Sequence, residues 1–187
     1  MPLDALCLTA VAGEVRAAVQ GGKIDKIYQP TRDEVVLYIR GPAGNVRLLL
    51  SANPGHPRAH LTERNRENPE QPPMFCMLLR KHLQGARILE LNQPPLERIL
   101  DFRLETLDEL GDRVERRLVL EAMGRSANLI LLDGEGRILD CIRRVEGDLA
   151  RGQRQLLPGL FYRQPPESDK LNPFTMDGDQ LAAALEN

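Results

Sequence analysis

The segment 98–107, RILDFRLETL, constrains the fold of this 187-residue chain more than any other stretch. Three apolar residues stand at alternate positions in it: Leu100, Phe102 and Leu104. Asp101 and Arg103 fall between them. Because successive side chains of a strand point to opposite faces, this alternation predicts a strand with one buried face and one solvated face. Such strands are typical of antiparallel sheets.

Seven other segments share the short length and the branched or aromatic residues of strands. They are residues 23–29, 34–40, 45–51, 86–93, 116–123, 128–133 and 137–144. A turn signal, GPAG at 41–44, separates the second from the third and predicts a β-hairpin. Further turns are expected at 109–112 and 133–136. The proline-rich stretch 51–72 is too long for a bare connection, so it is either a functional loop or locally ordered.

Helical spacing of apolar residues over 3–20 predicts a helix that starts the fold. Pro2 suits the first turn of this helix, and the glycine pair 21–22 ends it. Cys7 lies on its apolar face and is expected to be buried. A short acidic helix is expected over 177–186, after an irregular stretch that follows Arg144.

Residues 74–85 predict a second long helix, opened by Pro73 and closed by a glycine. Its expected core residues are Phe75, Leu78, Leu79 and Leu83, together with Cys76, Met74 and Met77. Its exposed edge would carry Arg80, Lys81 and His82. The order of helix, small sheet, helix and larger sheet predicts an α+β fold with antiparallel β-sheets and a few helices.

The net charge of −2 means that any contact with nucleic acid must depend on local basic clusters. Three such clusters occur: Arg58, Arg64 and Arg66; Arg80, Lys81 and His82; and Arg143, Arg144, Arg151 and Arg154. Taken alone, each is better explained as a solvated face. Aromatic residues make up 4% of the chain and Trp is absent, which argues against a single-stranded nucleic-acid platform built on base stacking.

Motifs for enzymatic chemistry are missing from the sequence. It contains no G-x-S-x-G, no G-x-G-x-x-G and no G-x-x-x-x-G-K-[ST] motif. The histidines lack metal-ligand spacing, the cysteines form no C-x-x-C pair, and 133–136 is better explained as a hairpin turn than as a metal loop. We therefore expect no catalytic residue, cofactor or metal. Without a leader or a membrane-spanning apolar run, we expect a cytoplasmic protein with no membrane partner.

Several motifs follow one another in an order that resembles a known family. They are residues 22–30, 51–54 with 60–62, 72–83, 123–126 with 128–131, 157–159, 165–166 and 170–173. The most specific is PPMFCMLLRKHL at 72–83. Through these motifs the chain resembles the NFACT-N domain, the N-terminal domain of the NFACT family, across nearly its whole length.

This resemblance implies a fold similar to the N-terminal domain of formamidopyrimidine-DNA glycosylases. Residues 1–173 would form the NFACT-N domain, and 174–187 would begin the connection to a following helix-hairpin-helix domain. It implies a module without catalytic activity that binds tRNA, specifically alanyl-tRNA, and the large ribosomal subunit carrying peptidyl-tRNA. Together with further domains, such a module would support C-terminal alanine tailing of stalled nascent chains.

The family's acidic–Arg pair matches Glu97 and Arg98, with Glu in place of the more usual Asp. The resemblance makes this pair a tRNA contact, whereas the residues alone favour a surface ion pair at a strand entrance. Six further candidate tRNA-binding residues are Arg125, Arg80, Lys81, His82, Arg58 and His60.

Two alternative functions come from other classes. Family members named for fibronectin binding suggest an adhesion protein at the cell surface. The likeness to DNA glycosylases suggests a lyase that uses the Pro2 nitrogen as its nucleophile. Against the second alternative, Pro2 is better explained as a residue that starts a helix.

Overall fold

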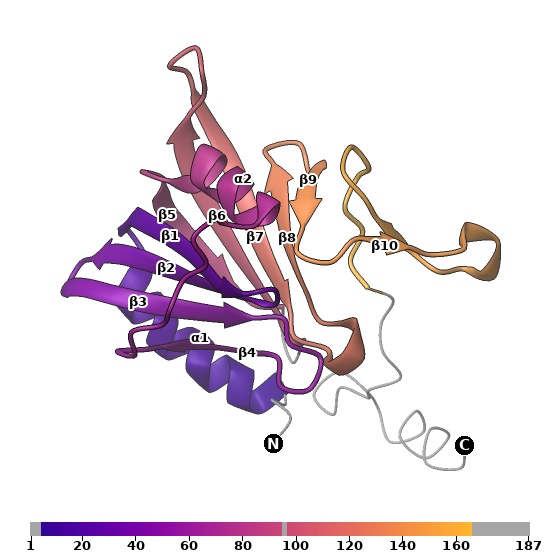
Figure 1. The fold of residues 1–187 in the computed structure, drawn as a ribbon, viewed down its shortest axis with the longest axis horizontal. Coiled ribbons are helices and arrows are strands. Elements are labelled where there is room, and N and C mark those ends of the chain that lie inside the picture. The colour runs from indigo at the N-terminus through magenta and orange to yellow at the C-terminus, as the bar shows by residue number, and fades with distance from the viewer. Residues whose placement is uncertain (1–4, 95–96, 166–187) are drawn as a thin grey trace.

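The computed structural model describes residues 5–94 and 97–165 of the chain (Figure 1). Its helices are α1 (Ala5–Val19) and α2 (Met74–Leu83). Its strands are β1 (Lys23–Thr31), β2 (Glu34–Gly41), β3 (Gly44–Ser51), β4 (Arg58–Leu61), β5 (Arg87–Asn92), β6 (Ile99–Leu107), β7 (Arg113–Glu121), β8 (Asn128–Asp133), β9 (Ile138–Cys141), β10 (Val145–Glu146) and β11 (Gln155–Leu156). Two short 3-10 helices are η1 (Gly124–Ser126) and η2 (Leu149–Arg151). None of the described helices is both long enough and apolar enough to span a bilayer.

Nine strands form one antiparallel sheet in the order β4-β3-β2-β1-β5-β6-β7-β8-β9. The sheet bends sharply between β1 and β5, whose only registered pair is Lys23 with Arg87. In Figure 1, β1 to β4 run across the view while β5 to β8 run steeply through it, so the two groups cross. The α+β fold expected from the sequence is confirmed. Pro2, the predicted boundary at residue 173 and the helix over 177–186 lie outside the described residues.

A single large core fills the space between the crossed groups and the two helices. The alternation in β6 is confirmed, because Leu100, Phe102 and Leu104 are all buried. Phe75 and Leu79 of α2 join the same core. Burial of this apolar surface between the two strand groups stabilises their crossing.

Three residues expected in the core lie outside it. Helix α1 buries one apolar stripe, formed by Leu8, Ala12, Val15 and Val19. Cys7 stands next to this stripe and is exposed. In α2, Met74 and Met77 are 74% and 55% exposed, because only the opposite face of this amphipathic helix meets the sheet.

The proline-rich stretch 51–72 is locally ordered, in agreement with one of the two expectations. Its first part folds as β4, which pairs with β3 from Ser51 with Arg58 to Leu48 with Leu61. The rest crosses the outer face of the first strand group (Figure 1). Arg66 fastens this crossing segment through a bidentate ion pair with Glu34, at 2.8 and 3.2 Å.

After β9 the chain forms an arm that packs on the other face of β6 to β9. A second, smaller core lies under this arm: Ile99, Val119, Ile130, Leu132, Ile138, Cys141 and Leu156. The arm is anchored at Glu121, a fully buried carboxylate. Arg154 and Tyr162 both donate hydrogen bonds to it.

Candidate nucleic-acid interface

The start of β6 and the β7–β8 turn form one corner of the sheet. The backbone N–H of Ala122 donates to the carbonyl of Arg98 at 2.8 Å, which places Glu97 and Arg98 beside the chain that leads into η1. Arg125 is exposed within η1. Gly124 opens this turn with a φ of +53°, a left-handed conformation that glycine adopts without steric cost. Glu97 and Arg98 therefore share one corner of the sheet with Arg125, which lies 28 residues after Glu97.

The backbone of the Glu97–Arg98 pair is held by local hydrogen bonds. The Glu97 N–H donates to the Pro94 carbonyl at 3.0 Å, and the side-chain amide of Gln93 donates to the Glu97 carbonyl at 2.7 Å. Both residues are half-buried. Within the described ranges 5–94 and 97–165, neither side chain makes an ion pair. The surface ion pair that the residues alone favoured is therefore not formed between described groups.

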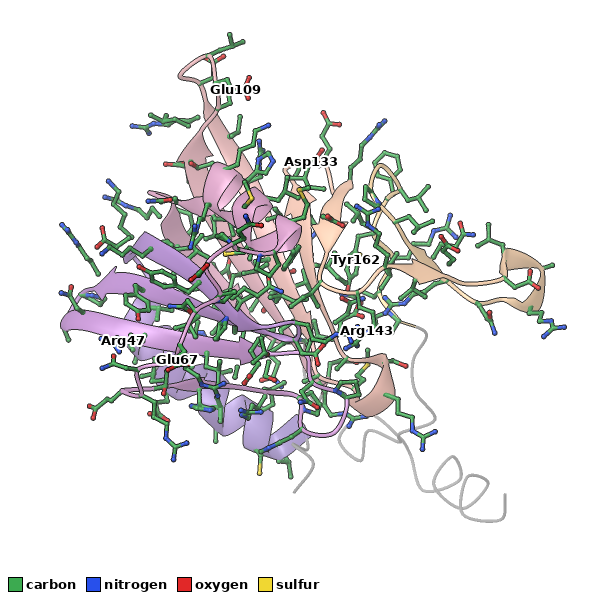
Figure 2. All side chains as sticks on the ribbon, in the orientation of Figure 1. Arg47, Glu67, Glu109, Asp133, Arg143 and Tyr162 are labelled. Atoms are coloured by element: carbon green, nitrogen blue, oxygen red, sulfur yellow. The ribbon has the colours of Figure 1, made fainter. Side chains whose placement is uncertain are left out.

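Arg143, labelled in Figure 2, joins this corner to the β1–β2 turn and to the end of β3. Its guanidinium donates to the Ala127 carbonyl at 2.6 Å, to the Asp33 carboxylate at 2.9 Å and to the Ala52 carbonyl at 3.3 Å. The Asn128 side chain in turn binds the Arg143 backbone. The β1–β2 turn, which carries the exposed Arg32, is thereby fixed next to η1.

We name the group formed by Arg32, Glu97, Arg98 and Arg125 the sheet-end surface. None of its three guanidinium groups has an ion-pair partner among the described residues. The nearby carboxylate of Asp33 is already neutralised by Arg143. An arginine without a carboxylate partner keeps its planar set of donors for a phosphate or a base.

Arg58 and His60 were predicted to bind tRNA, but their polar groups are already engaged. Arg58 forms an ion pair with Glu34 at 3.1 Å and reaches Ser51 at the border of the sheet-end surface. His60 lies further along β4, with its Nδ1 3.0 Å from the Leu61 carbonyl. The structure therefore gives Arg58 a structural role and places His60 away from the sheet-end surface.

Lys81 and His82 lie at the opposite end of the β6–β7 pair. Together with Leu107, Glu109 and Arg116 they line a hollow beside the β6–β7 hairpin tip. The paired strands run from Ile99 with Glu121 to Leu107 with Arg113. At about 3.3 Å per residue, this separates the two ends by roughly 25 Å.

The expected cationic edge of α2 is also weaker than predicted. Burial lowers the pKa of His82, and the charges of Arg116 and Lys81 lower it further, so the imidazole is neutral near pH 7. Lys81 forms an ion pair with Glu109 at 3.6 Å. Placing Arg80 on the exposed edge was wrong: it is half-buried, and its Nε donates to the Ile27 carbonyl at 2.8 Å. The same carbonyl also accepts from the Cys76 thiol at 3.8 Å.

Each arginine of the third basic run forms an ion pair with a carboxylate. The pairs are Arg143 with Asp33, Arg144 with Asp140, Arg151 with Asp148 and Arg154 with Glu121.

Arg32 was not among the RNA-binding residues predicted from the sequence. The position of Arg32 between two predicted strands indicates a turn. Its proximity to η1 depends on the contacts of Arg143 with Asp33 and Ala127, which sequence spacing could not predict.

Comparison with known proteins identifies the family to which this architecture corresponds. The family model for NFACT N-terminal and middle domains matches residues 4–187. The Rqc2 homolog RqcH of Bacillus subtilis is 39% identical over 186 residues, covering 99% of this chain and 32% of that protein. The human ribosome quality control complex subunit NEMF is 29% identical over 136 residues, covering 73% of the chain and 12% of that protein. The chain thus spans about a third of its bacterial relative.

Solved structures of the same fold are also similar. The N-terminal domain of the fibronectin-binding protein PavA from Streptococcus pneumoniae superposes with a TM-score of 0.87 at 39% identity, covering 99% of this chain and 69% of that one. The fibrinogen-binding protein of Staphylococcus aureus gives a TM-score of 0.81 at 31% identity, with coverages of 98% and 64%.

Proposed function

This chain belongs to the NFACT N-terminal domain family, and from that premise we propose that it is an RNA-binding module of a ribosome quality control factor. The sheet-end surface is the proposed contact for tRNA. Relatives named for ribosome quality control in bacteria and in humans support the biological setting. We propose alanyl-tRNA and the large ribosomal subunit with peptidyl-tRNA as the partners, engaged for C-terminal alanine tailing.

The observation that carries the proposal is the meeting of Arg32, Arg98 and Arg125 at one corner of the sheet. Three unpaired guanidinium groups favour the phosphate backbone of a folded RNA. Glu97 adds an acceptor that can orient Arg98 or accept a hydrogen bond from the amino group of a base. With a net charge of −2, the chain would depend on this local surface for attraction.

We propose a binding role rather than a catalytic one, with peptide-bond formation left to the ribosome. The sheet-end surface contains arginines and one carboxylate, a set suited to recognition of phosphates and bases. The adhesion alternative is not favoured, because the curated relatives that share this domain are named for ribosome quality control. No observation favours the lyase alternative, since Pro2 lies outside the described residues.

Capture of the tagged protein from a cell lysate, followed by sequencing of the bound RNA, tests the proposal. We expect tRNA and large-subunit rRNA to be enriched with the wild type. Glu97→Ala/Arg98→Ala and Arg125→Ala should each lose tRNA, whereas Arg113→Ala, an exposed arginine at the distant hairpin, should retain it. Equal tRNA recovery with all four proteins would refute the sheet-end surface as the contact.

A further inference from the structure

Two arginines and two tyrosines form a continuous ladder on the outer face of β1 to β3. The guanidinium of Arg47 lies over the Tyr38 ring at 4.8 Å from its centroid. The Tyr38 and Tyr28 rings meet edge to face, with centroids 5.0 Å apart. At the other end, the Arg80 guanidinium lies 5.4 Å from the Tyr28 centroid. Such cation–π pairs hold flat groups at fixed positions on the sheet.

Strand register builds this ladder. Tyr38 pairs with Lys26 on one side and with Arg47 on the other, so these three side chains form a row across the sheet. Tyr28 follows on the same face of β1. The hydrogen bond from the Arg80 Nε to the Ile27 carbonyl then fixes the guanidinium that covers its ring.

A hollow of about 310 Å³ opens beside the Tyr28 end of the ladder. Its lining consists of Lys26, Ile27, Tyr28, Arg80 and Gln84. The lining contains two cations and no carboxylate. Lys26 is exposed, and neither it nor Arg80 forms an ion pair with a described residue. A concave site with an aromatic ring, unpaired cations and a side-chain amide suits a ligand that is both planar and anionic.

We propose that this hollow binds one unpaired nucleotide of an RNA strand. The base would stack on the Arg80 guanidinium, which the Tyr28 ring supports from the other side, since guanidinium planes stack on unstacked bases. Lys26 would bind the phosphate, and the Gln84 amide, which both donates and accepts, would contact the base edge. The site needs one ring only, so the low aromatic content of the chain does not oppose it.

The neighbouring hollow at the Arg47 end suits a phosphate less well. It measures about 680 Å³ and its lining carries three carboxylates, Glu14, Asp25 and Glu63, against two arginines, Arg40 and Arg47. The excess of carboxylates opposes a phosphate there, and Arg40 is already paired with Asp25, whereas the Tyr28 hollow has two cations and no carboxylate. The nucleotide is therefore assigned to the Tyr28 hollow alone. The Tyr28 hollow contains no residue of the sheet-end surface. If it does not bind a nucleotide, the proposed function is therefore unaffected.

Binding of a 5′-fluorescein-labelled ten-adenosine RNA to this 187-residue chain, followed by anisotropy, tests the site. Tyr28→Leu and Lys26→Ala should each weaken binding about tenfold, within the range that loss of one stacked base produces. Tyr28→Phe keeps the ring and should bind as the wild type does. Arg113→Ala removes one positive charge elsewhere and is the matched control for Lys26→Ala. Circular dichroism melting would verify that each variant is folded.

Adenosine monophosphate distinguishes the two possible sources of the nucleotide. Displacement of the labelled RNA by the free nucleotide, lost in Tyr28→Leu, would support a site that accepts mononucleotides. Binding of the RNA without such displacement, still weakened in Tyr28→Leu, would support a site that requires a strand. If Tyr28→Leu and Lys26→Ala bind the RNA as tightly as Arg113→Ala does, the proposal is wrong, whatever the effect of Arg125→Ala.

Discussion

Glu121 is fully buried, and two side chains from the C-terminal arm stabilise its charge. Arg154 donates to both carboxylate oxygens, and the Tyr162 hydroxyl donates to one of them. Burial raises the pKa of Tyr162, and the adjacent Glu121 charge raises it further, so the phenol remains a donor at any physiological pH. Glu121 is the last residue of β7 and precedes the turn that carries Arg125. Its contacts with Arg154 and Tyr162 therefore also support the sheet-end surface.

We expect Arg154→Ala to lower the free energy of unfolding by about 3 kcal/mol, because it leaves a buried carboxylate without its counter-ion. Arg151→Ala is the matched control from the same run. The side chains of Arg151 and Asp148 are 80% and 52% exposed, and exposed pairs contribute little. Urea unfolding of both variants measures the difference. Equal stability of the two would mean that Glu121 takes up a proton or finds another partner.

The cysteines differ in burial, and this difference predicts their reactivity. Burial raises the pKa of Cys141 to about 12, and the neighbouring Asp140 acts in the same direction, so almost no thiolate exists at pH 8. Cys76 is also buried with a raised pKa, whereas Cys7 is exposed. Since the thiolate is the reactive form, Ellman's reagent at pH 8 should modify one thiol quickly and two only after unfolding. The fast reaction should be absent from Cys7→Ser.

At the scale of elements, apolar periodicity predicted most of the structure. The strand expected over 98–107 is β6, and the helix expected from residue 74 is α2. Each of these segments buries one face, and that requirement is written into its own sequence. The role of Arg80 could not be predicted in this way. Its hydrogen bond joins α2 to β1, two segments that are distant in sequence and meet only in the folded protein.

Arg143 fixes η1 to the β1–β2 turn and to the end of β3, so its removal should loosen three elements together. We expect Arg143→Ala to increase hydrogen exchange at 31–34 and 124–127 and to weaken tRNA binding about tenfold, because Arg32 and Arg125 lose their shared position. Arg144→Ala is the control, since its guanidinium is more exposed and, among the described residues, pairs with Asp140 alone. Faster exchange with unchanged tRNA binding would show that tRNA binding does not depend on the shared position of Arg32 and Arg125.

At the scale of the whole molecule, nearness in sequence was a poor guide to the site. Lys81 and His82 precede Glu97 by 16 and 15 residues but lie at the other end of β6. Arg98 and Arg125 are far apart in sequence but adjacent in space, because an antiparallel pair returns the chain to the corner from which it started. The Glu97–Arg98 pair was found through family resemblance, whereas its grouping with Arg32 needed the folded sheet.

A phosphate-binding surface on a chain of net charge −2 should be recognisable from the salt dependence of binding. Each cation that neutralises a phosphate releases counterions, so removing one should lower the slope of log K against log salt by about 0.7 to 0.9. We therefore expect Arg32→Ala, Arg98→Ala and Arg125→Ala each to reduce the slope for tRNA by this amount. The triple variant should reduce it by about two to three, because the three losses add.

Glu97→Gln is the informative comparison for this series, because it removes a negative charge from the same surface. A role in contacting a base or orienting Arg98 predicts weaker tRNA binding with an unchanged slope, whereas simple repulsion of the phosphates predicts tighter binding. Anisotropy titrations with labelled tRNA from 50 to 300 mM KCl measure both quantities at once. Slopes that stay at the wild-type value in all three arginine variants would place the phosphate contacts on another face, and the sheet-end surface would then lose its assigned role.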